Sequence, residues 1–194
     1  MTTTTTRPFP ATDRAAILAL AETYWRFGSD RANAEERAIE AAEFHLRRGT
    51  GLSRDEFVRI ARWKSKRPTR HYLKNTEAEV SRATLAAFQA RTEAEAIGAL
   101  TDLHGVGLRT ATAILHWLRP KEFPILDFRV VGALGETEPK SWEDVAYYSR
   151  IAARVRELAT KYGVSLRELD RALWAWKKRD ACNAPRPRVS PHRR

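Results

Sequence analysis

The sequence has 194 residues, which is enough for one domain or at most two small ones. Hydrophobic residues make up 43% and charged residues 30%, and no stretch approaches the roughly 20 apolar residues of a membrane span, which excludes a membrane-embedded chain. The formal net charge of +11 favours a polyanionic partner, and the single cysteine, Cys182, excludes a disulfide framework, a cysteine-bound zinc site and an iron–sulfur cluster held by four of the chain's own thiolates.

Residues 1–10 are a threonine run followed by Arg-Pro-Phe-Pro. Because this segment lacks the apolar stretch of a secretory signal, we expect a cytoplasmic protein with a disordered N-terminus. From residue 11 to residue 178, apolar residues recur at spacings of three and four, with few β-branched alternations. This period predicts a single all-α domain over residues 11–178.

The apolar pattern places a first helix over residues 17–24 and a second over residues 38–46, which the stretch Gly49-Thr50-Gly51 stops. A later helix is expected over residues 146–158. Capping boxes predict three further helix starts, at Ser53 with Glu56, Thr92 with Glu95, and Ser165 with Glu168. The first of these three helices ends before Pro68.

Residues 62–74 combine six Lys or Arg residues with two aromatic residues and no acid. Basic side chains bind phosphates, and aromatic rings stack on unpaired bases with about 1 to 3 kcal/mol each. The phosphate contacts that we expect are Lys64, Lys66, Arg67 and Arg70. The alternative is a solvated loop that Trp63 and Tyr72 anchor to the core.

A very short connection joins two helical patterns within residues 100–115. Gly105-Val106-Gly107 must reverse the chain, because one apolar pattern ends at Leu103 and the next begins directly after the glycines. A helix that starts here directs unpaired N–H groups and the positive end of its dipole outward, where a phosphate can bind whatever the base sequence. The alternative is a tight helix–helix connection without a ligand.

A proline-containing loop follows, and it ends on a carboxylate. Pro124 breaks any helix, and Asp127 precedes a new apolar face that begins at Val130. Asp127 is either an ordinary N-cap, which contributes about 1 kcal/mol, or a catalytic group. As a catalytic group it would stabilise positive charge that develops on a deoxyribose held by the glycines.

The C-terminal residues 179–194 contain three prolines and many arginines with almost no apolar content, so a disordered basic tail is expected. Residues 177–194 contain seven Lys or Arg residues and one acid, Asp180. Their net charge is more than half of the net positive charge of the chain. Such a tail is typical of a non-specific electrostatic accessory rather than a dedicated recognition element. The function must therefore be sought in the body of the chain.

Residues 100–134 resemble the signature of the helix-hairpin-helix GPD superfamily of base-excision DNA glycosylases, and within it the adenine glycosylase and endonuclease III-like branches. The residues that carry the resemblance are Leu103-His-Gly-Val-Gly-Leu-Arg-Thr-Ala111 and Phe123-Pro-Ile-Leu-Asp127. The resemblance implies a compact helical glycosylase-like fold that contains a helix-hairpin-helix motif. It also implies that Asp127 is the catalytic carboxylate, acting on a nucleotide whose base has been flipped out of the duplex.

The resemblance assigns further roles around the hairpin. The implied DNA contacts are His104, Gly105, Val106, Gly107, Arg109 and Thr110. A monovalent cation, Na or K, is implied at the main-chain carbonyls of Thr101, Leu103 and Val106. Arg109 stands where bifunctional members place a lysine nucleophile, and because a guanidinium cannot form a Schiff base, a monofunctional enzyme without strand cleavage is implied.

Some positions depart from the family pattern. His104 replaces the usual hairpin proline, and Phe128 follows the aspartate where many members have a small residue. The four-cysteine cluster of several branches is absent, so no iron–sulfur cluster is expected. The pocket and the strand contacts are therefore in doubt. The candidates for the base pocket, or for insertion into the gap that a flipped nucleotide leaves, are Trp63, Tyr72 and Trp117. The alternative for each ring is a place in the core.

The function expected from these residues is a monofunctional DNA glycosylase that hydrolyses the N-glycosidic bond of a damaged, modified or mismatched base. Its partner is DNA, with no membrane contact and no cofactor for catalysis. The alternative is a catalytically inactive helix-hairpin-helix module that binds DNA in a structural or regulatory role. Retention of Asp127 after the proline loop favours the enzyme, because a module without chemistry has no need of that acid.

Overall fold

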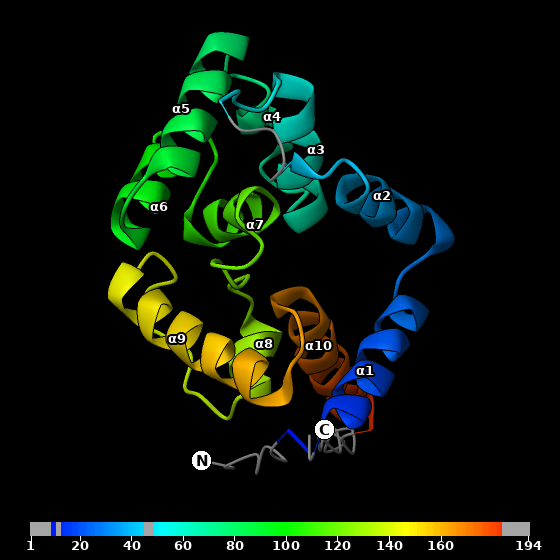
Figure 1. Ribbon diagram of the computed structural model, residues 1–194. Helices are drawn as coiled ribbons and strands as arrows, with labels where there is room; N and C mark the ends of the chain where they lie inside the picture. Colours follow the sequence, from blue (N-terminus) through cyan, green and yellow to red (C-terminus); the bar gives the residue numbers. More distant parts are fainter. Residues whose placement is uncertain (1–8, 11–12, 45–48, 184–194) are drawn as a thin grey trace, which may run out of the picture.

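The computed structural model describes residues 9–10, 13–44 and 49–183 (Figure 1). Within these ranges the chain forms helices and no strand, which confirms the all-α prediction. The elements in chain order are α1 (Arg14–Thr23), the 3-10 helix η1 (Tyr24–Phe27), α2 (Asp30–Glu40), α3 (Arg54–Lys64), α4 (Thr69–Tyr72), α5 (Glu77–Gln89), α6 (Glu93–Thr101), α7 (Leu108–Leu118), α8 (Phe128–Ala133), α9 (Val145–Tyr162) and α10 (Leu166–Asn183). None of these helices is long and apolar enough to cross a membrane.

Capping explains where most of these helices start. All three predicted capping boxes are present, and they open α3, α6 and α10. A fourth, formed by Thr76 and Glu79, opens α5. In each box a hydroxyl accepts the N–H three residues later, and a glutamate accepts the N–H of the cap, so two of the unpaired donors at the helix start are satisfied.

Two predicted boundaries are wrong. The second helix is not residues 38–46: α2 starts at Asp30 on its Ser29 cap and ends at Glu40, and Glu43 takes a φ of 45°, which no right-handed helix can continue through. Leu46, at the end of that prediction, lies outside the described residues.

The predicted basic tail also begins too early, because α10 continues to Asn183. Arg179 lies over the ring of Trp176, with 5.1 Å to its centroid, and Lys177 lies 3.7 Å from Asp180 one turn away, so charged residues extend the helix along its exposed side. Residues 1–8 and 184–194 of the two ends predicted to be disordered lie outside the described residues.

The main contacts divide the helices into two groups (Figure 1). One group contains α2 to α7, in which α3 packs on α7 and α5 packs on α6. In the other group α10 packs against α1, α8 and α9. The chain passes from the first group to the second through the loop between α7 and α8. Side chains at this junction are therefore contributed by both groups.

Helix α7 forms the centre of the first group, and every residue from Thr110 to Leu118 is buried. It is buried on nearly all sides, as is typical of a helix enclosed by others. His116 on this helix is 1% exposed, and its Nδ1 lies 2.9 Å from the carbonyl oxygen of Phe123. Burial, together with the nearby charge of Arg167, lowers the pKa of His116 to about 3, so the ring is neutral at neutral pH.

Candidate active site

Asp127 is the N-cap of α8, and the loop before it is held in place by the two helix groups. The N–H of Leu126 donates to Thr112 Oγ1 at 3.1 Å, and the hydroxyl of Tyr148 donates to the carbonyl of Pro124, also at 3.1 Å. The Oδ1 atom of Asp127 accepts the N–H of Arg129 at 2.9 Å. One carboxylate oxygen thus caps the helix, and Oδ2 is left for a side chain or a ligand.

Lys64 at the end of α3 takes that second oxygen: its Nζ lies 3.0 Å from Oδ2 of Asp127. The Asp127 side chain is 17% exposed. Burial alone would raise its pKa, but the ammonium of Lys64 and the N–H of Arg129 outweigh burial and hold the pKa below its ordinary value. Asp127 is therefore ionised at neutral pH. Lys64, expected among the phosphate contacts, lies instead against this carboxylate.

The connection between α6 and α7, residues 102–107, is called the glycine turn below. Gly105 has a φ of 83°, and a Cβ built on it would lie 2.8 Å from His71 Cβ and 3.1 Å from the ring of Tyr72. Both the backbone conformation and the space therefore require glycine. The turn lies directly against α4, within the basic segment that the sequence singled out.

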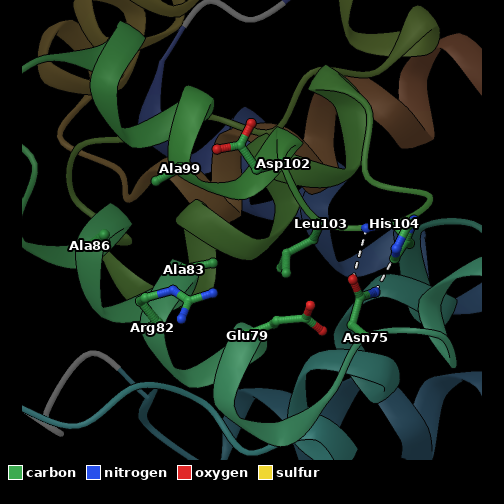
Figure 2. Close-up of a pocket in the computed structure, with 9 residues that line it drawn as sticks. All are labelled: Asn75, Glu79, Arg82, Ala83, Ala86, Ala99, Asp102, Leu103 and His104. Carbon is green, nitrogen blue, oxygen red and sulfur yellow. Dashed lines mark hydrogen bonds between the residues drawn. The ribbon is translucent and has the colours of Figure 1, made fainter.

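Asn75 holds the glycine turn in place through the main chain of His104 (Figure 2). Its Nδ2 donates to the carbonyl of His104 at 3.1 Å, and its Oδ1 accepts the N–H of His104 at 2.8 Å. Asn75 is 2% exposed, and Nδ2 also donates to the carbonyl of Tyr72. The side chain of His104 is exposed, and with Asn75 it borders the cavity of ≈ 360 Å³ drawn in Figure 2. No motif in the sequence points to Asn75.

A glutamate occupies the start of α7, where a phosphate was expected. The N–H of Leu108 donates to Oε2 of Glu143 at 2.7 Å, and a Cβ built on Gly107 would lie 2.7 Å from the other oxygen of the same carboxylate. Glu143 is exposed and lies in the segment before α9. The N–H at the start of α7 thus binds an anion, but that anion is a side chain of this protein, and phosphate binding stays a prediction.

Two cavities meet at Asp127. The first, here named the turn pocket, has ≈ 340 Å³ and is lined by Gly105, Gly107, Arg109, Thr110, Asp127 and Glu143, among others. The second, here named the aromatic pocket, has ≈ 220 Å³ and is lined by Tyr24, Trp63, Asp127, Arg167, Asp170 and Trp174, among others. Lys64, Asp127 and Arg129 belong to both. The structure thus brings the glycine turn and Asp127 together at one cavity.

A group of buried charges, here named the ion cluster, supports the aromatic pocket. It consists of Glu36 on α2 with Arg167, Asp170 and Arg171 on α10. Glu36, 2% exposed, binds Arg167 and lies 2.9 Å from Nη2 of Arg171, and Arg167 also binds Asp170. Burial would raise the pKa of Glu36, but Arg167 and Arg171 outweigh it and keep the glutamate ionised. The cluster joins the two helix groups.

Aromatic groups of the pocket are tied to the same glutamate. The Oε2 atom of Glu36 accepts the hydroxyl of Tyr24 at 2.7 Å and the Nε1–H of Trp63 at 3.2 Å. Arg167 lies over the ring of Trp63, with 5.1 Å to its centroid. Nothing in the sequence singled out Glu36, because its partners come from α3, η1 and α10.

The predicted aromatic candidates have different positions. Trp63 lines the aromatic pocket. Trp117 is 7% exposed and packs behind it, with ring centroids 5.6 Å apart at an interplanar angle of 72°. Tyr72 is fully buried, its hydroxyl 3.4 Å from Thr110 Oγ1, so it cannot be inserted into DNA and instead supports the glycine turn. Two large apolar side chains are exposed nearby: Leu73 at 48%, which the sequence did not single out, and Phe128, the residue after Asp127, at 40%.

The remaining predicted contacts are at the surface or in the main chain. The exposed cations of the basic segment include Lys66, Arg67 and Arg70. Arg109 is exposed too, 5.2 Å from the ring centroid of Trp142. Among the predicted cation-binding carbonyls, that of Leu103 accepts the N–H of Val106 at 3.1 Å, and the carbonyl of Thr101 belongs to the last residue of α6. In the described part of the chain, no three His, Cys, Asp or Glu side chains are grouped as metal ligands.

Comparison with known proteins adds no family. No protein-family model, no curated protein and no solved structure matches this chain. The geometry around Asp127 is therefore the basis for assigning a function to this protein.

Proposed function

We propose that the chain is a monofunctional DNA glycosylase of the helix-hairpin-helix type, which hydrolyses the N-glycosidic bond of a damaged, modified or mismatched base. One observation carries the proposal: an ionised, half-enclosed carboxylate lies between a cavity bordered by a glycine turn and a cavity with aromatic walls. The first cavity suits a phosphate, the second suits a flat ring, and the sugar that joins them would lie at Asp127.

The turn pocket supports binding of the DNA backbone. A strand phosphate would replace the carboxylate of Glu143 at the N–H of Leu108, with Arg109 beside it. Exposed cations of the basic segment, such as Arg67 and Arg70, extend the positive surface from there. These contacts are to phosphates, so they position the duplex without reading its sequence. Leu73, exposed two residues after His71, is a candidate wedge between base steps.

The chemistry proposed at the junction needs only the carboxylate and water. As the bond between C1′ and the base nitrogen breaks, positive charge develops on the sugar, and the ionised Asp127 stabilises it. The electron pair of the broken bond goes to the base nitrogen, the oxygen of a water molecule bonds to C1′, and the proton that this water gives up balances the proton that the base takes up. Arg109 cannot form a Schiff base, and the amine of Lys64 is held in an ion pair with Asp127, so the sugar remains as an abasic site on an intact strand.

Incubation with single-lesion duplexes tests this proposal. The panel covers alkylated, deaminated, oxidised and mismatched bases, and abasic sites are revealed as alkali-labile breaks. We expect breaks only after alkali, for at least one lesion class, and no protein–DNA adduct after borohydride reduction. Protein carrying Asp127→Asn, purified in parallel, controls for contaminating glycosylases. Absence of abasic sites across the panel, with DNA binding intact, would identify the chain as a binding module instead.

The proposed cation at the turn has a separate test. The carbonyl of Leu103 already accepts one hydrogen bond, but a carbonyl oxygen has two lone pairs, so it can still contact a cation. If the carbonyls of Thr101, Leu103 and Val106 bind K⁺ or Na⁺ beside a phosphate, DNA affinity at constant ionic strength will be higher in potassium or sodium than in tetramethylammonium chloride. Equal affinities would remove the cation from the proposal.

A further inference from the structure

We propose, on the basis of the function proposed above, that the ring of Phe128 stacks on the base next to the flipped nucleotide in the same strand. Binding and excision would then depend on whether this neighbouring base is a purine or a pyrimidine. This makes Phe128 a specificity-determining residue outside the aromatic pocket, and it takes no part in breaking the glycosidic bond.

The ring of Phe128 is exposed beside the candidate catalytic carboxylate. Phe128 is 40% exposed and follows Asp127 directly, as the first residue of α8. Among the described residues, Leu73 is the one other large apolar side chain that is this exposed. Single exposed rings are common on protein surfaces and carry no function by themselves. The position of this ring, next to Asp127, is what points to a ligand.

The two pockets show which part of a bound strand Phe128 could contact. Phe128 lines the turn pocket, whereas the residues that line the aromatic pocket do not include it. A base flipped into the aromatic pocket would therefore not contact this ring. The turn pocket is the cavity proposed for the strand backbone, and the nearest other bases on that backbone are the two neighbours of the flipped nucleotide. The ring is thus placed for one of these neighbours.

Arg129 supports the ring from one side. Its Cζ lies 4.3 Å from the ring centroid of Phe128 and 4.7 Å from that of Trp174 on α10. The guanidinium covers one face of Phe128, and the exposure of the ring leaves surface for a base. A ring held in this way loses little side-chain freedom when a ligand stacks on it, which favours binding. Aromatic rings combined with arginines are typical of surfaces that bind unstacked bases.

Flipping creates the base face that Phe128 would cover. When a nucleotide leaves the duplex, each of its neighbours loses one stacking partner, so two base faces open toward the gap. Phe128 would replace the lost partner of one neighbour. Every base has a face on which a ring can stack, but a purine offers more ring area than a pyrimidine. The expected result is a graded preference at one neighbouring position, not a strict sequence requirement.

The test measures the affinity of the protein for duplexes that carry a tetrahydrofuran residue, a sugar without a base, at the position to be flipped. Each neighbour in turn is exchanged from A·T to T·A, which changes the base in the bound strand and keeps the type of base pair. Fluorescence anisotropy should show that the wild type binds about three- to tenfold more tightly with a purine at one of the two neighbours.

Three variants of Phe128 separate stacking from apolar contact. Phe128→Ala and Phe128→Leu should reduce the purine preference to below about twofold, and Phe128→Tyr should retain it, because only a ring can stack. The intrinsic flexibility of each duplex affects all proteins alike, so loss of the preference is attributable to the ring. A wild type without any purine preference, or a Phe128→Ala variant that keeps the preference, overturns the assignment. Loss of wild-type self-association in Phe128→Ala, with unchanged DNA binding, would assign the ring to a contact between two copies and also overturns it.

Single-turnover excision on the same sequences distinguishes this assignment from the proposed function. Base release that does not depend on either neighbour overturns the role of Phe128 and leaves the glycosylase proposal standing. Neighbour-dependent binding without release of any base supports the stacking role in a DNA-binding module and overturns the glycosylase proposal.

Discussion

The two pockets that share Asp127 are built in different ways. The turn pocket is bordered by main-chain groups of the glycine turn and by exposed side chains such as Arg109. The aromatic pocket consists of half-buried rings and of charges that are paired in the interior. Main-chain groups bind phosphates of any sequence, whereas the shape and polarity of side chains distinguish one base from another. Under the proposed function, DNA binding and base selection are thus assigned to separate structures, and substitutions can perturb them one at a time.

The largest effect is expected at the group that both pockets share. Asp127→Asn should reduce single-turnover base release by about 10³-fold or more, because a neutral amide stabilises positive charge on the sugar poorly. Its DNA affinity should stay within a few fold of the wild type, since phosphates are bound elsewhere. Rapid-quench assays measure the first quantity and fluorescence anisotropy the second.

Lys64 loses its ion-pair partner in that variant, so stability must be measured alongside. The double variant Lys64→Met with Asp127→Asn removes both charges and should recover thermal stability but no activity. A single Asp127→Asn variant that releases base at the wild-type rate would contradict the role of the carboxylate.

The next largest effect is expected in the ion cluster behind the aromatic pocket. Glu36→Gln leaves the buried guanidiniums of Arg167 and Arg171 without their shared anion and should lower the free energy of unfolding by about 3–5 kcal/mol, measured by urea denaturation. Glu40→Gln is the matched control: Glu40 is 45% exposed and pairs with Arg171, so its loss should cost below about 1 kcal/mol. Similar effects of the two variants would mean that the cluster does not stabilise the junction of the helix groups.

A smaller effect, confined to the turn pocket, is expected from Gly105→Ala. The methyl group meets His71 and Tyr72 at a φ of 83°, so the free energy of unfolding should fall by about 1–3 kcal/mol and DNA affinity should fall with it. Gly98→Ala in α6 has open space around the added methyl group and should instead stabilise the chain by about 0.5–1 kcal/mol. Thermal denaturation measures the change in stability, and fluorescence anisotropy measures DNA affinity. A Gly105→Ala variant with wild-type stability and DNA affinity would show that the glycine turn does not contribute to DNA binding.

The smallest effect is expected at the carboxylate that occupies the start of α7. Glu143→Gln should strengthen DNA binding by up to about fivefold, because it removes a competing anion at an exposed site where a charge pair is worth up to about 1 kcal/mol. Glu138→Gln changes the net charge equally in the same loop and should have a weaker effect. If both variants bind DNA alike, then general charge, and not occupancy of the amide, explains the gain.

Local signals in the sequence were sufficient for most of the fold. Helix starts at Ser53, Thr92 and Ser165 follow from a hydroxyl and a glutamate three residues apart, and the same signal at Thr76 would have predicted α5. The end of α2 could not be predicted from such local signals, because it depends on the left-handed backbone conformation of Glu43.

The site was only partly predictable, for a physical reason. Asp127 and the glycine turn stand close together in the sequence and carry a recognisable spacing. The groups that complete their surroundings come from distant segments: Glu36 meets Arg167 across 131 residues, and Glu143 reaches Leu108 across 35. Tyr72 is a different case. An aromatic residue among basic residues gives the same sequence pattern whether its ring stacks on a base or fills the core. Only the tertiary arrangement separates these cases.

The ion cluster also bears on whether the protein or the DNA would deform when the two bind. Glu36 belongs to one helix group and the arginines that surround it to the other, so separating the groups would break the ion pairs of Glu36 with Arg167 and Arg171. Under the proposed function, the protein would thus act as a stiff template on either side of Asp127. If the proposed function holds, a duplex that delivers a nucleotide to this carboxylate must bend and unstack to do so, and lesions or mismatches that soften the helix would be engaged first because they distort at lower energetic cost.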